Sequence, residues 1–338
     1  MKTVSMTMPA EWQQHECCWM AWPCRQDLWQ NISAARDAFA QVAKAISAFE
    51  PVIMVCHQSD KVDCERQVGQ FAQVLVWPID DSWTRDSGPT FVRTQDGSLS
   101  VVNWQFNGWG GQFTPYDQDA EFARRVAQHL ELSVIESSLT TEGGAIHVNG
   151  AGLALTTEQC LLNSNRNSGW SKEQIEGEFS RCLGVDKTIW LERGLTDDHT
   201  DGHIDELACF VSERELVALY CDDSSDSNYS ILQNNYQRLI QATDVNEQPL
   251  KVQKIHQPEA RFLSDQSRMS LSYINFYLPN KGLIMAEFNQ PDYDRAAKET
   301  LQQCFPEREI IQLPALDIFQ GGGGIHCITQ QQPIAKVV

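Results

Sequence analysis

GGGIHC, at residues 322–327, repeats the pattern of an earlier stretch, GGAIHV at residues 143–148. Both read G-G-x-I-H, and glycines in such positions permit a close approach of backbone to neighbouring groups. Two matching stretches can arise by chance. The order of the elements around them points the same way, to the internal repetition of one structural unit.

Five stretches with apolar residues at helical spacing are each followed by a short β-rich run. Ser33 is the expected N-cap of the first helix, and Ser171 with Gln174 forms a capping-box pattern. Helices that link strands of one sheet indicate right-handed crossovers, so the order predicts five α/β units in a radial or solenoid arrangement. A doubly wound chain of two domains is the alternative. The pairs are 33–48 with 51–56, 119–132 with 133–135, 171–183 with 187–191, 228–242 with 250–255, and 292–304 with 309–313, where Tyr293, Ala297 and Leu301 share one face; further strands are expected at 90–94, 100–104, 153–157, 207–211, 216–220, 272–278 and 282–288.

The composition is that of a globular protein, with 338 residues, 42% hydrophobic and 21% charged. Its net charge of -19 argues against nucleic-acid or anionic-membrane partners, which require clustered Lys and Arg. No apolar run approaches the ~20 residues of a membrane span. The N-terminal stretch MKTVSMTMPAEW lacks the apolar core of an export signal, so we expect a cytoplasmic protein. Its eleven cysteines, without a C-x-x-C pair, are expected to be mostly reduced thiols.

Cys327 follows four glycines, which allow the backbone to approach a ligand and to turn its N–H groups toward an intermediate. A nucleophilic cysteine must be accessible and near a base or cation. The alternative is a small buried hydrophobic residue, which is what most free cysteines are. Cys327 is the one cysteine whose surroundings suggest catalysis.

The segment DDHTDGHIDE, at 197–206, carries two candidate functional residues. His203 and Asp205 would lie on one face of an extended segment, where a histidine moves protons near neutral pH and an aspartate holds a cationic group. A metal site is equally consistent with the spacing, because alternate residues share one face. A solvated acidic turn is the third interpretation. The alternate residues are Asp197, His199, Asp201, His203 and Asp205.

Acidic residues and tryptophans mark two further turns. Asp86 follows Arg85, a candidate ion-pair partner, and Glu142 precedes two glycines and could orient a histidine. The alternatives are a plain turn residue for Asp86 and an exposed strand-end acid for Glu142. Trp83 and Trp109 in isolation favour core positions, although aromatic walls also suit a cation.

Two carboxylates, a histidine, an orienting glutamate and a cysteine together match a planar guanidinium group. Its five N–H donors form a rigid fork that carboxylates bind in pairs. Its carbon is a weak electrophile because the charge spreads over three nitrogens. Attack therefore suits a thiolate, and an acid must protonate the departing nitrogen.

A series of motifs runs nearly the whole length of the chain: MPAEWQQHE, WMAWP, DDSWTRDSGPTFV, FNGWGG, EGGAIHVNGAG, CLLNSNRN, TDGHIDELACFV, SYINFYL and GGGGIHCITQQQP. Together they resemble the agmatine and bacterial peptidylarginine deiminase family of the guanidine-modifying, or pentein, superfamily. The resemblance implies an α/β fold: a five-bladed α/β propeller of pseudo-fivefold ββαβ-type repeats around a central active site. It also implies a single deiminase domain over residues 1–338.

The resemblance further implies the hydrolysis of agmatine to N-carbamoylputrescine and ammonia, a step from arginine to putrescine, without a metal or organic cofactor. Matched by motif, Cys327 is the nucleophile that forms a covalent thiouronium, and His203 is the general acid and base. Asp86 and Asp205 bind the guanidinium, while Glu142 orients His203. The implied partners are a small cationic guanidino substrate and further copies of the chain in a homo-oligomer. The expected substrate-binding residues are Trp83, Asp86, Asp205, Trp109 and His199.

Two positions depart from the family pattern. His199 stands where several agmatine-acting relatives carry an acidic residue, and Gly324 stands where relatives often carry asparagine. A deiminase of free arginine or peptidyl-arginine is therefore the alternative activity. Two other classes stay open, a metal-dependent hydrolase that uses residues 197–205 and an inactive propeller that serves as a binding module.

Overall fold

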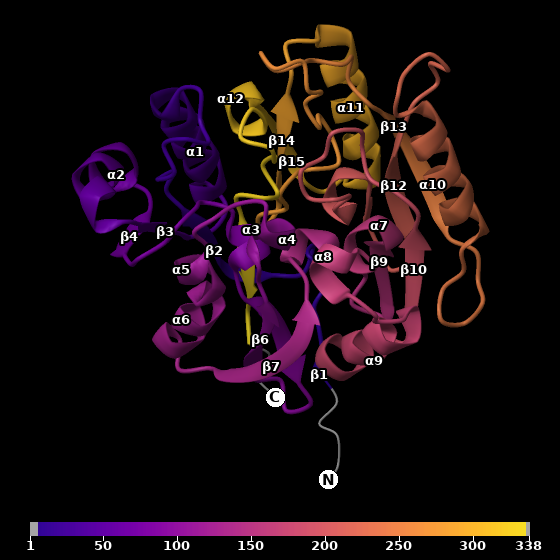
Figure 1. The fold of residues 1–338 in the computed structure, drawn as a ribbon, viewed down its shortest axis with the longest axis horizontal. Helices are drawn as coiled ribbons and strands as arrows, with labels where there is room; N and C mark the ends of the chain where they lie inside the picture. Colours follow the sequence, from indigo (N-terminus) through magenta and orange to yellow (C-terminus); the bar gives the residue numbers. More distant parts are fainter. Residues whose placement is uncertain (1–5, 336–338) are drawn as a thin grey trace.

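A computed structural model of the chain describes residues 6–335. Residues 1–5, part of the stretch for which no export signal is expected, and residues 336–338 lie outside this range. The strands fall into five separate sheets. Figure 1 shows these sheets around a centre where α3 (Thr84–Ser87) lies, with the long helices toward the periphery. Within the described range, no helix is both long and apolar enough to cross a membrane.

The first sheet joins segments from opposite ends of the chain. Strands β2, β3 and β4 run parallel, and β16 pairs antiparallel with β2. The last strand therefore completes the sheet that β2 begins. In spatial order the strands are β16 (Gln330–Pro333), β2 (His15–Ala21), β3 (Val52–Cys56) and β4 (Gln73–Val76), with helices α1 (Ile32–Ser47), η1 (Gln58–Asp60) and α2 (Lys61–Val68).

The second and third sheets follow in chain order. The second comprises β1 (Met6–Thr7), β5 (Thr90–Thr94), β6 (Leu99–Gln105) and β7 (Ser133–Thr140), with α4 (Gly108–Gly111), α5 (Asp117–Ala120) and α6 (Phe122–His129). The third comprises β10 (Lys187–Leu191), β9 (Leu153–Thr157) and β8 (His147–Val148), with η2 (Gly143–Ala145), α7 (Glu158–Leu161), α8 (Ser164–Asn167) and α9 (Lys172–Leu183).

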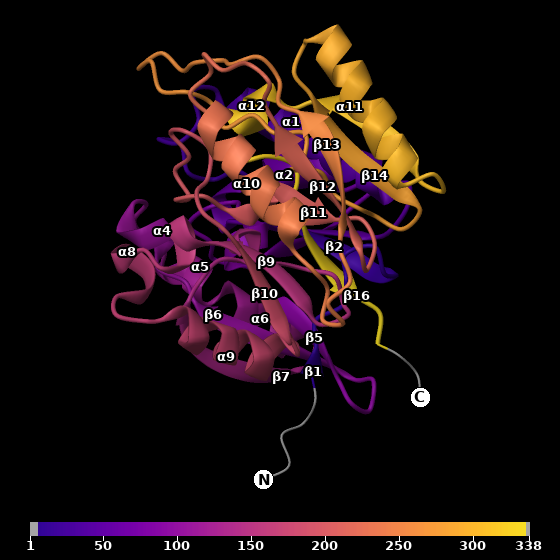
Figure 2. The ribbon, with the colours of Figure 1, turned by 90° about the vertical axis from the view of Figure 1, so that its right-hand side faces the viewer.

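The fourth and fifth sheets complete the arrangement, which Figure 2 shows from the side. The fourth comprises β11 (Ala208–Phe210), β12 (Glu215–Tyr220) and β13 (Lys251–His256), with η3 (Ile204–Glu206) and α10 (Tyr229–Gln241). The fifth comprises β14 (Gly282–Glu287) and β15 (Glu309–Pro314), with α11 (Pro291–Cys304) and α12 (Leu316–Phe319).

Each sheet contains two parallel strands that are joined through at least one outer helix. The five helix–strand pairs predicted from the sequence are therefore present. Helix α1 shows why they form: Phe39, Val42 and Ile46 recur on one face and are buried. The capping box of Ser171 and Gln174 is also confirmed at the start of α9.

Several local predictions are wrong. The N-cap of α1 is Asn31, whose side chain accepts hydrogen bonds from the backbone N–H groups of Ser33 and Ala34, so the helix begins earlier than expected. The helix expected over 119–132 is divided into α5 and α6, which meet at Glu121, and Asp119 within α5 accepts a hydrogen bond from Asp80 N.

Two predictions for the C-terminal half of the chain are also wrong. Tyr293 is 39% exposed although its spacing placed it on the buried face of α11. The segment 272–278 forms no strand and makes a single isolated bridge at Tyr277. Its polar groups instead bond to segments distant in sequence, such as Ser272 Oγ to Glu206 O at 2.7 Å. This segment passes directly beside the site described next.

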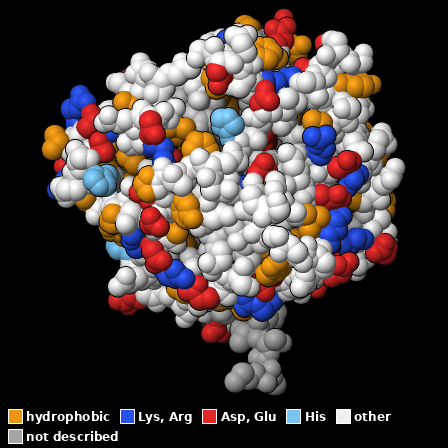
Figure 3. All heavy atoms as spheres, in the orientation of Figure 1, with side chains coloured by type: hydrophobic (Ala, Val, Ile, Leu, Met, Phe, Trp, Pro, Cys, Tyr) orange, Lys and Arg blue, Asp and Glu red, His pale blue; other side chains and the backbone are white. Residues whose placement is uncertain are grey.

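The surface carries both signs of charge. Figure 3 shows acidic and basic side chains interspersed over the face seen in Figure 1, without a broad basic patch on that face. The face seen in Figure 3 therefore offers no broad basic surface of the kind that binds a polyanion.

Candidate active site

A narrow cavity of about 20 Å³ lies among α3, α4 and the glycine loop that precedes Cys327. Its walls combine aromatic rings, a glycine loop and a few polar groups, which is typical of a small-molecule site. Five of the residues proposed from the sequence line it: Trp83, Asp86, Trp109, His199 and Cys327. His203, Asp205 and Glu142 are buried behind this wall. The other lining residues are Leu28, Asp81, Phe113, Thr200, Gly321, Gly322 and Gly323.

Cys327 lies in the loop between α12 and β16, and it is 4% exposed. Its Sγ is 3.1 Å from Asn275 Nδ2, which donates to it, and 3.5 Å from Asp205 Oδ2. Burial, followed by the charges of Asp205, Glu206 and Asp86, raises the pKa of Cys327 well above its usual range. The sulfur is therefore held as a thiol until a cation offsets these carboxylates.

His203 is fully buried at the start of η3, so His203 and Asp205 belong to a tight helical turn and not to the extended segment expected. Its Nε2 lies 3.4 Å from Glu142 Oε2, and its Nδ1 lies 3.6 Å from Asp86 Oδ1. Burial opposes a charge here, but Asp86 and Glu142 outweigh it and raise the pKa of His203 well above its usual value. This shift favours the imidazolium form of the ring.

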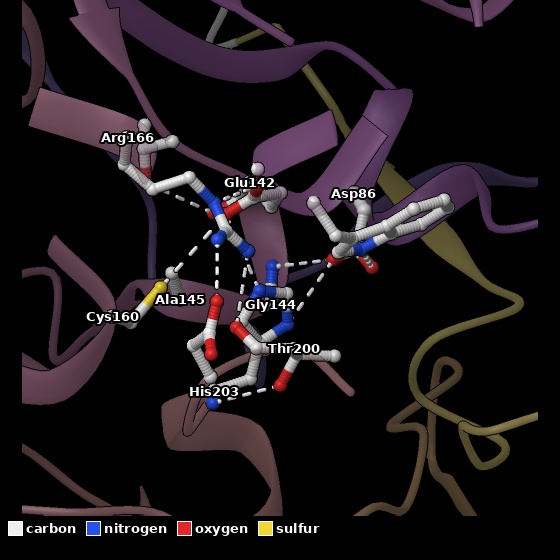
Figure 4. A network of polar contacts seen from close by, with 12 residues as sticks. Asp86, Glu142, Gly144, Ala145, Cys160, Arg166, Thr200 and His203 are labelled. Atoms are coloured by element: carbon white, nitrogen blue, oxygen red, sulfur yellow. Dashed lines mark hydrogen bonds and ion pairs between the residues drawn. The ribbon is translucent and has the colours of Figure 1, made fainter. Parts of the chain in front are cut away.

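Glu142 is held in place by a guanidinium behind it. Arg166 Nε donates to Glu142 Oε1 at 2.8 Å, and Arg166 Nη1 reaches Asp201 Oδ2 at 2.7 Å. Figure 4 shows Glu142 between Arg166 and His203. Glu142 is fully buried, so its interpretation as an exposed strand-end acid is wrong.

Asp86 comes from α3 at the wall of the cavity. Its Oδ1 accepts from Gly144 N at 3.0 Å, and its Oδ2 accepts from Trp109 Nε1 at 2.9 Å. A Cβ at Gly144 would lie 2.5 Å from His203 Nδ1 and 2.7 Å from Asp86 Oδ1. The glycine of the first G-G-x-I-H stretch is therefore required for this close approach. Burial raises the pKa of Asp86 to about 6.

Asp205 has one occupied and one unoccupied oxygen. Its Oδ2 accepts from His326 Nδ1 at 2.8 Å, whereas Oδ1 is buried without a hydrogen-bond partner among the described residues. Burial would raise the pKa of Asp205, but the hydrogen bond and charge of His326 lower it overall. A charged carboxylate with one unpaired oxygen is prepared to bind an N–H donor.

The ion pair expected between Arg85 and Asp86 is not formed. Arg85 Nη1 instead lies 3.4 Å from Glu11 Oε1, because its side chain turns away from the cavity. The metal site suggested by alternate residues of 197–205 is not formed either. Asp197 accepts from Arg268 N, and Asp201 pairs with Arg166, so these carboxylates point to different neighbours.

Two other groups of side chains could present metal ligands within 4.8 Å of one another: Glu142, Cys160 and His203, and Asp205, Glu206 and Cys327. The first already contains the Arg166 guanidinium on Glu142, which opposes a second cation. The second coincides with the thiol and the unpaired oxygen of Asp205. These oxygen and sulfur atoms therefore suit an organic cation with N–H groups at least as well as a metal ion.

Sequence reasoning missed several functional residues. Asn275 contacts Cys327 but was placed in an expected strand, and no signal distinguished it there. Arg166 and Glu11 lie within quoted motifs, yet nothing in those motifs indicates which acid or base they meet. Asp81 lines the cavity and pairs with Arg25 at 2.8 Å, and burial raises its pKa to about 6.

Comparisons with known proteins agree on one family. A model of the Porphyromonas-type peptidyl-arginine deiminase family matches residues 7–333. A relative from Legionella pneumophila is 42% identical over 335 residues, covering 98% of this chain and 96% of that protein. Agmatine deiminase from Stutzerimonas stutzeri is 41% identical over 354 residues, covering 96% of this chain and 95% of its own length. Among solved structures, agmatine deiminase of Enterococcus faecalis superposes with a TM-score of 0.94 at 35% identity, covering 99% of this chain and 97% of its own.

Proposed function

Because this chain belongs to the Porphyromonas-type peptidyl-arginine deiminase family, we propose that it hydrolyses the guanidinium group of agmatine to N-carbamoylputrescine and ammonia. The agmatine deiminases among its relatives and structural neighbours support this choice within the family. The proposal makes the protein a hydrolase of C–N bonds in linear amidines, acting in polyamine synthesis.

One observation carries the proposal: Asp205 Oδ1 is buried without a hydrogen-bond partner among the described residues, and Asp205 Oδ2 lies 3.5 Å from Cys327 Sγ. Leaving such an acceptor unpaired costs about 1–3 kcal/mol. A guanidinium supplies N–H donors for Asp205 and Asp86 at once. Its carbon then faces Cys327 Sγ, and positioning of this kind provides much of the rate enhancement.

The substrate itself prepares the nucleophile. Burial, together with Asp205, Glu206 and Asp86, raises the pKa of Cys327 and holds it as a thiol, and a guanidinium between Asp86 and Asp205 offsets the charge of these carboxylates. The thiolate then becomes accessible because the substrate cation lowers the pKa of the sulfur. Free reactive thiolate is thereby confined to the occupied site.

The reaction proceeds in two halves. Cys327 Sγ attacks the guanidinium carbon, and the His203 imidazolium donates its proton to one terminal nitrogen, which leaves as ammonia. The carbon remains bound to sulfur as an S-alkylthiouronium. Water then attacks that carbon while neutral His203 takes its proton, the C–S bond breaks, and the ureido product leaves with Cys327 restored. Glu142 holds the ring of His203 through both halves.

The walls of the cavity favour agmatine over free arginine. Trp83, Trp109 and Phe113 provide aromatic faces for a cationic alkyl chain, and His199 lies at the same wall. No Lys or Arg is among its described lining residues, so nothing there pairs with the carboxylate of free arginine. Deimination of peptidyl-arginine is the second candidate, because the matching family is named for it.

We extend the proposal to the architecture and location of the protein. Five sheets, each with a parallel pair joined through an outer helix, support one domain built as a five-bladed propeller. Eleven free thiols favour a reducing compartment such as the cytoplasm. We also infer a homo-oligomer, from family resemblance.

Ammonia release from agmatine, arginine and a peptide with C-terminal arginine tests the proposed function. Of the three compounds, we expect only agmatine to release ammonia, and we expect Cys327→Ala to abolish this release. Near wild-type release by Cys327→Ala would exclude the thiol mechanism. Mass spectrometry of acid-quenched protein should detect the thiouronium adduct on Cys327. Activity that depends on added metal and is lost to chelator would instead support a metal-dependent hydrolase.

A further inference from the structure

The histidines of the two G-G-x-I-H stretches meet at one buried carboxylate. His326 Nε2 lies 2.9 Å from Glu11 Oε1 and 3.1 Å from Glu11 Oε2. His147 Nε2 lies 3.8 Å from Glu11 Oε2, and Arg85 Nη1 lies 3.4 Å from Glu11 Oε1. Each of these side chains is at most 6% exposed. The two copies of the motif thus bring their histidines, together with Arg85, to one buried carboxylate, and His326 directly precedes Cys327 in the chain.

One member of this cluster reaches the site. His326 Nδ1 lies 2.8 Å from Asp205 Oδ2, so its ring bridges two carboxylates, one on each nitrogen. Within residues 6–335, His147 bonds to no residue that lines the cavity or contacts Cys327, and its pKa falls to about 4, chiefly through burial. The two histidines therefore share a partner, but their pKa values shift in opposite directions, and only His326 bonds a carboxylate that contacts Cys327.

The electrostatics of the bridge agree with its geometry. Burial and Arg85 disfavour a charge on His326, yet Glu11 and the hydrogen bonds to both carboxylates outweigh them and raise the pKa of His326. Burial also raises the pKa of Glu11, but His326, Arg85 and His147 bring it well below the usual value. In this bridge, His326 therefore favours its imidazolium form and lies between the carboxylates of Glu11 and Asp205.

We propose that Glu11 and His326 are positioning residues that hold Asp205 charged and oriented for the guanidinium, although neither lines the cavity. The inference rests on the proposed function, in which Asp205 binds that group. Burial and the nearby carboxyl group of Asp86 both disfavour the negative charge of Asp205. The imidazolium on Oδ2 offsets them.

The bridge also fixes which oxygen meets the substrate. Because His326 Nδ1 engages Oδ2, the carboxylate plane is set and Oδ1 is left as the unpaired acceptor among the described residues. Glu11 holds the other side of the ring and so prevents His326 from rotating away. Removing the Glu11 charge should favour neutral His326, which weakens the hold on Asp205 without touching any atom of the cavity wall.

Agmatine binding to an inactive background provides the test. Calorimetry on Cys327→Ala should detect binding, and adding Glu11→Gln or His326→Asn should weaken it about tenfold or more, the factor expected from one lost charge-assisted hydrogen bond. Glu11→Asp, which keeps the charge, should retain more affinity than Glu11→Gln. With Cys327 intact, Glu11→Gln should raise KM by a larger factor than it lowers kcat, which simple loss of folded protein would not do.

Asp294→Asn is the matched control, because Asp294 is a buried carboxylate bonded to Tyr273 Oη and to the backbone N–H of Phe288, and neither partner lines the cavity. It should lower the melting temperature and leave agmatine affinity unchanged. Equal affinity in the Glu11→Gln and parent proteins, or equal weakening by Asp294→Asn, would overturn the inference. If Glu11→Gln does not fold, His326→Asn decides by the same criterion. Absence of binding by the Cys327→Ala parent would refute the proposed function instead.

Discussion

Asn275 bonds to Cys327 through both ends of its side-chain amide. Its Nδ2 donates to Cys327 Sγ at 3.1 Å, and its Oδ1 accepts from Cys327 N at 3.4 Å and from His326 N at 2.8 Å. The same Nδ2 is 3.1 Å from Glu206 Oε1. One amide therefore fixes the loop and gives the sulfur a donor that favours its thiolate form.

Replacing Asn275 with alanine should lower kcat for agmatine by about tenfold to a hundredfold, the value of one hydrogen bond to a charged group. The thiolate loses its donor, and the loop loses two backbone bonds. Steady-state kinetics and the rate of Cys327 alkylation by iodoacetamide measure the effect. Asn235→Ala, a buried asparagine that bonds Glu192 N and Arg193 O, should affect stability alone. Unchanged alkylation in Asn275→Ala would contradict this role.

Gly324 is required because of the space that its neighbours fill. A Cβ there would lie 2.4 Å from Asn275 Oδ1 and 2.4 Å from the rigid Phe319 ring. Gly324→Ala should therefore destabilise the protein by about 1–3 kcal/mol and displace Asn275 from Cys327, lowering activity. Thermal unfolding and kinetics measure both effects. Gly177→Ala, with open space around it in α9, should instead stabilise the helix by about 0.5–1 kcal/mol.

Trp109 holds Asp86 through a single indole hydrogen bond of 2.9 Å. Trp109→Phe removes this bond and keeps an aromatic wall, so KM for agmatine should rise about tenfold. Trp104→Phe removes an indole bond of the same length to Thr90 Oγ1 away from the cavity. Its kinetics should match those of the wild type. Equal KM in the two variants would exclude a specific role for Trp109.

Protonation of Asp86 should set the acid limit of activity. Burial, with Asp205 and Glu142 adding to it, raises the pKa of Asp86 to about 6. The anion that binds the guanidinium forms only above that value, so kcat/KM for agmatine should fall as pH drops through about 6. A pH profile of the initial rate measures this. A profile that stays flat down to about pH 4.5 would contradict it.

The raised pKa of Asp86 affects folding stability in the opposite direction to activity. The pKa of Asp86 in the folded protein lies above the roughly 3.9 of an unfolded aspartate, so the folded state favours the protonated form. The contribution of Asp86 to folding stability is therefore greatest below about pH 4 and is lost as pH rises through 6. Asp86→Asn should therefore gain about 2–3 kcal/mol relative to wild type between about pH 4 and pH 8, the equivalent of two pKa units. Denaturant unfolding at several pH values measures the gain. Parallel stability curves for the two proteins would refute it.

The sequence predicts the repeating units because each depends on local periodicity. Phe39, Val42 and Ile46 identify α1, and Ser171 with Gln174 identifies the start of α9. The segment 272–278 misleads for the same reason. It has the composition of a strand, but its hydrogen bonds go to Glu206 and to the Cys327 loop, which are far away in sequence.

The residues of the candidate site also form two groups, those that the sequence alone identifies and those that only the fold reveals. Asp86, His203 and Cys327 carry chemistry in their residue types and glycine-bounded turns, so the sequence alone identifies them as candidates. Their partners cannot be identified in this way: Arg85 meets Glu11 and not its neighbour Asp86, a choice made by packing. Glu11 and Asn275 are recognised only when the fold brings them to the Cys327 loop.

Because β16 pairs with β2, the first sheet can be completed only at the end of synthesis. Trp19 Nε1 bonds Gln332 Oε1 across a separation of 313 residues, and Cys327 lies just before β16. While the ribosome is still translating residues 22–326, the first sheet lacks its edge strand and the cavity lacks its sulfur. A nascent chain that ends before residue 327 can therefore contain every carboxylate of the site but lacks the Cys327 sulfur. The Cys327 thiol joins the site only when the glycine loop has emerged and β16 has paired with β2.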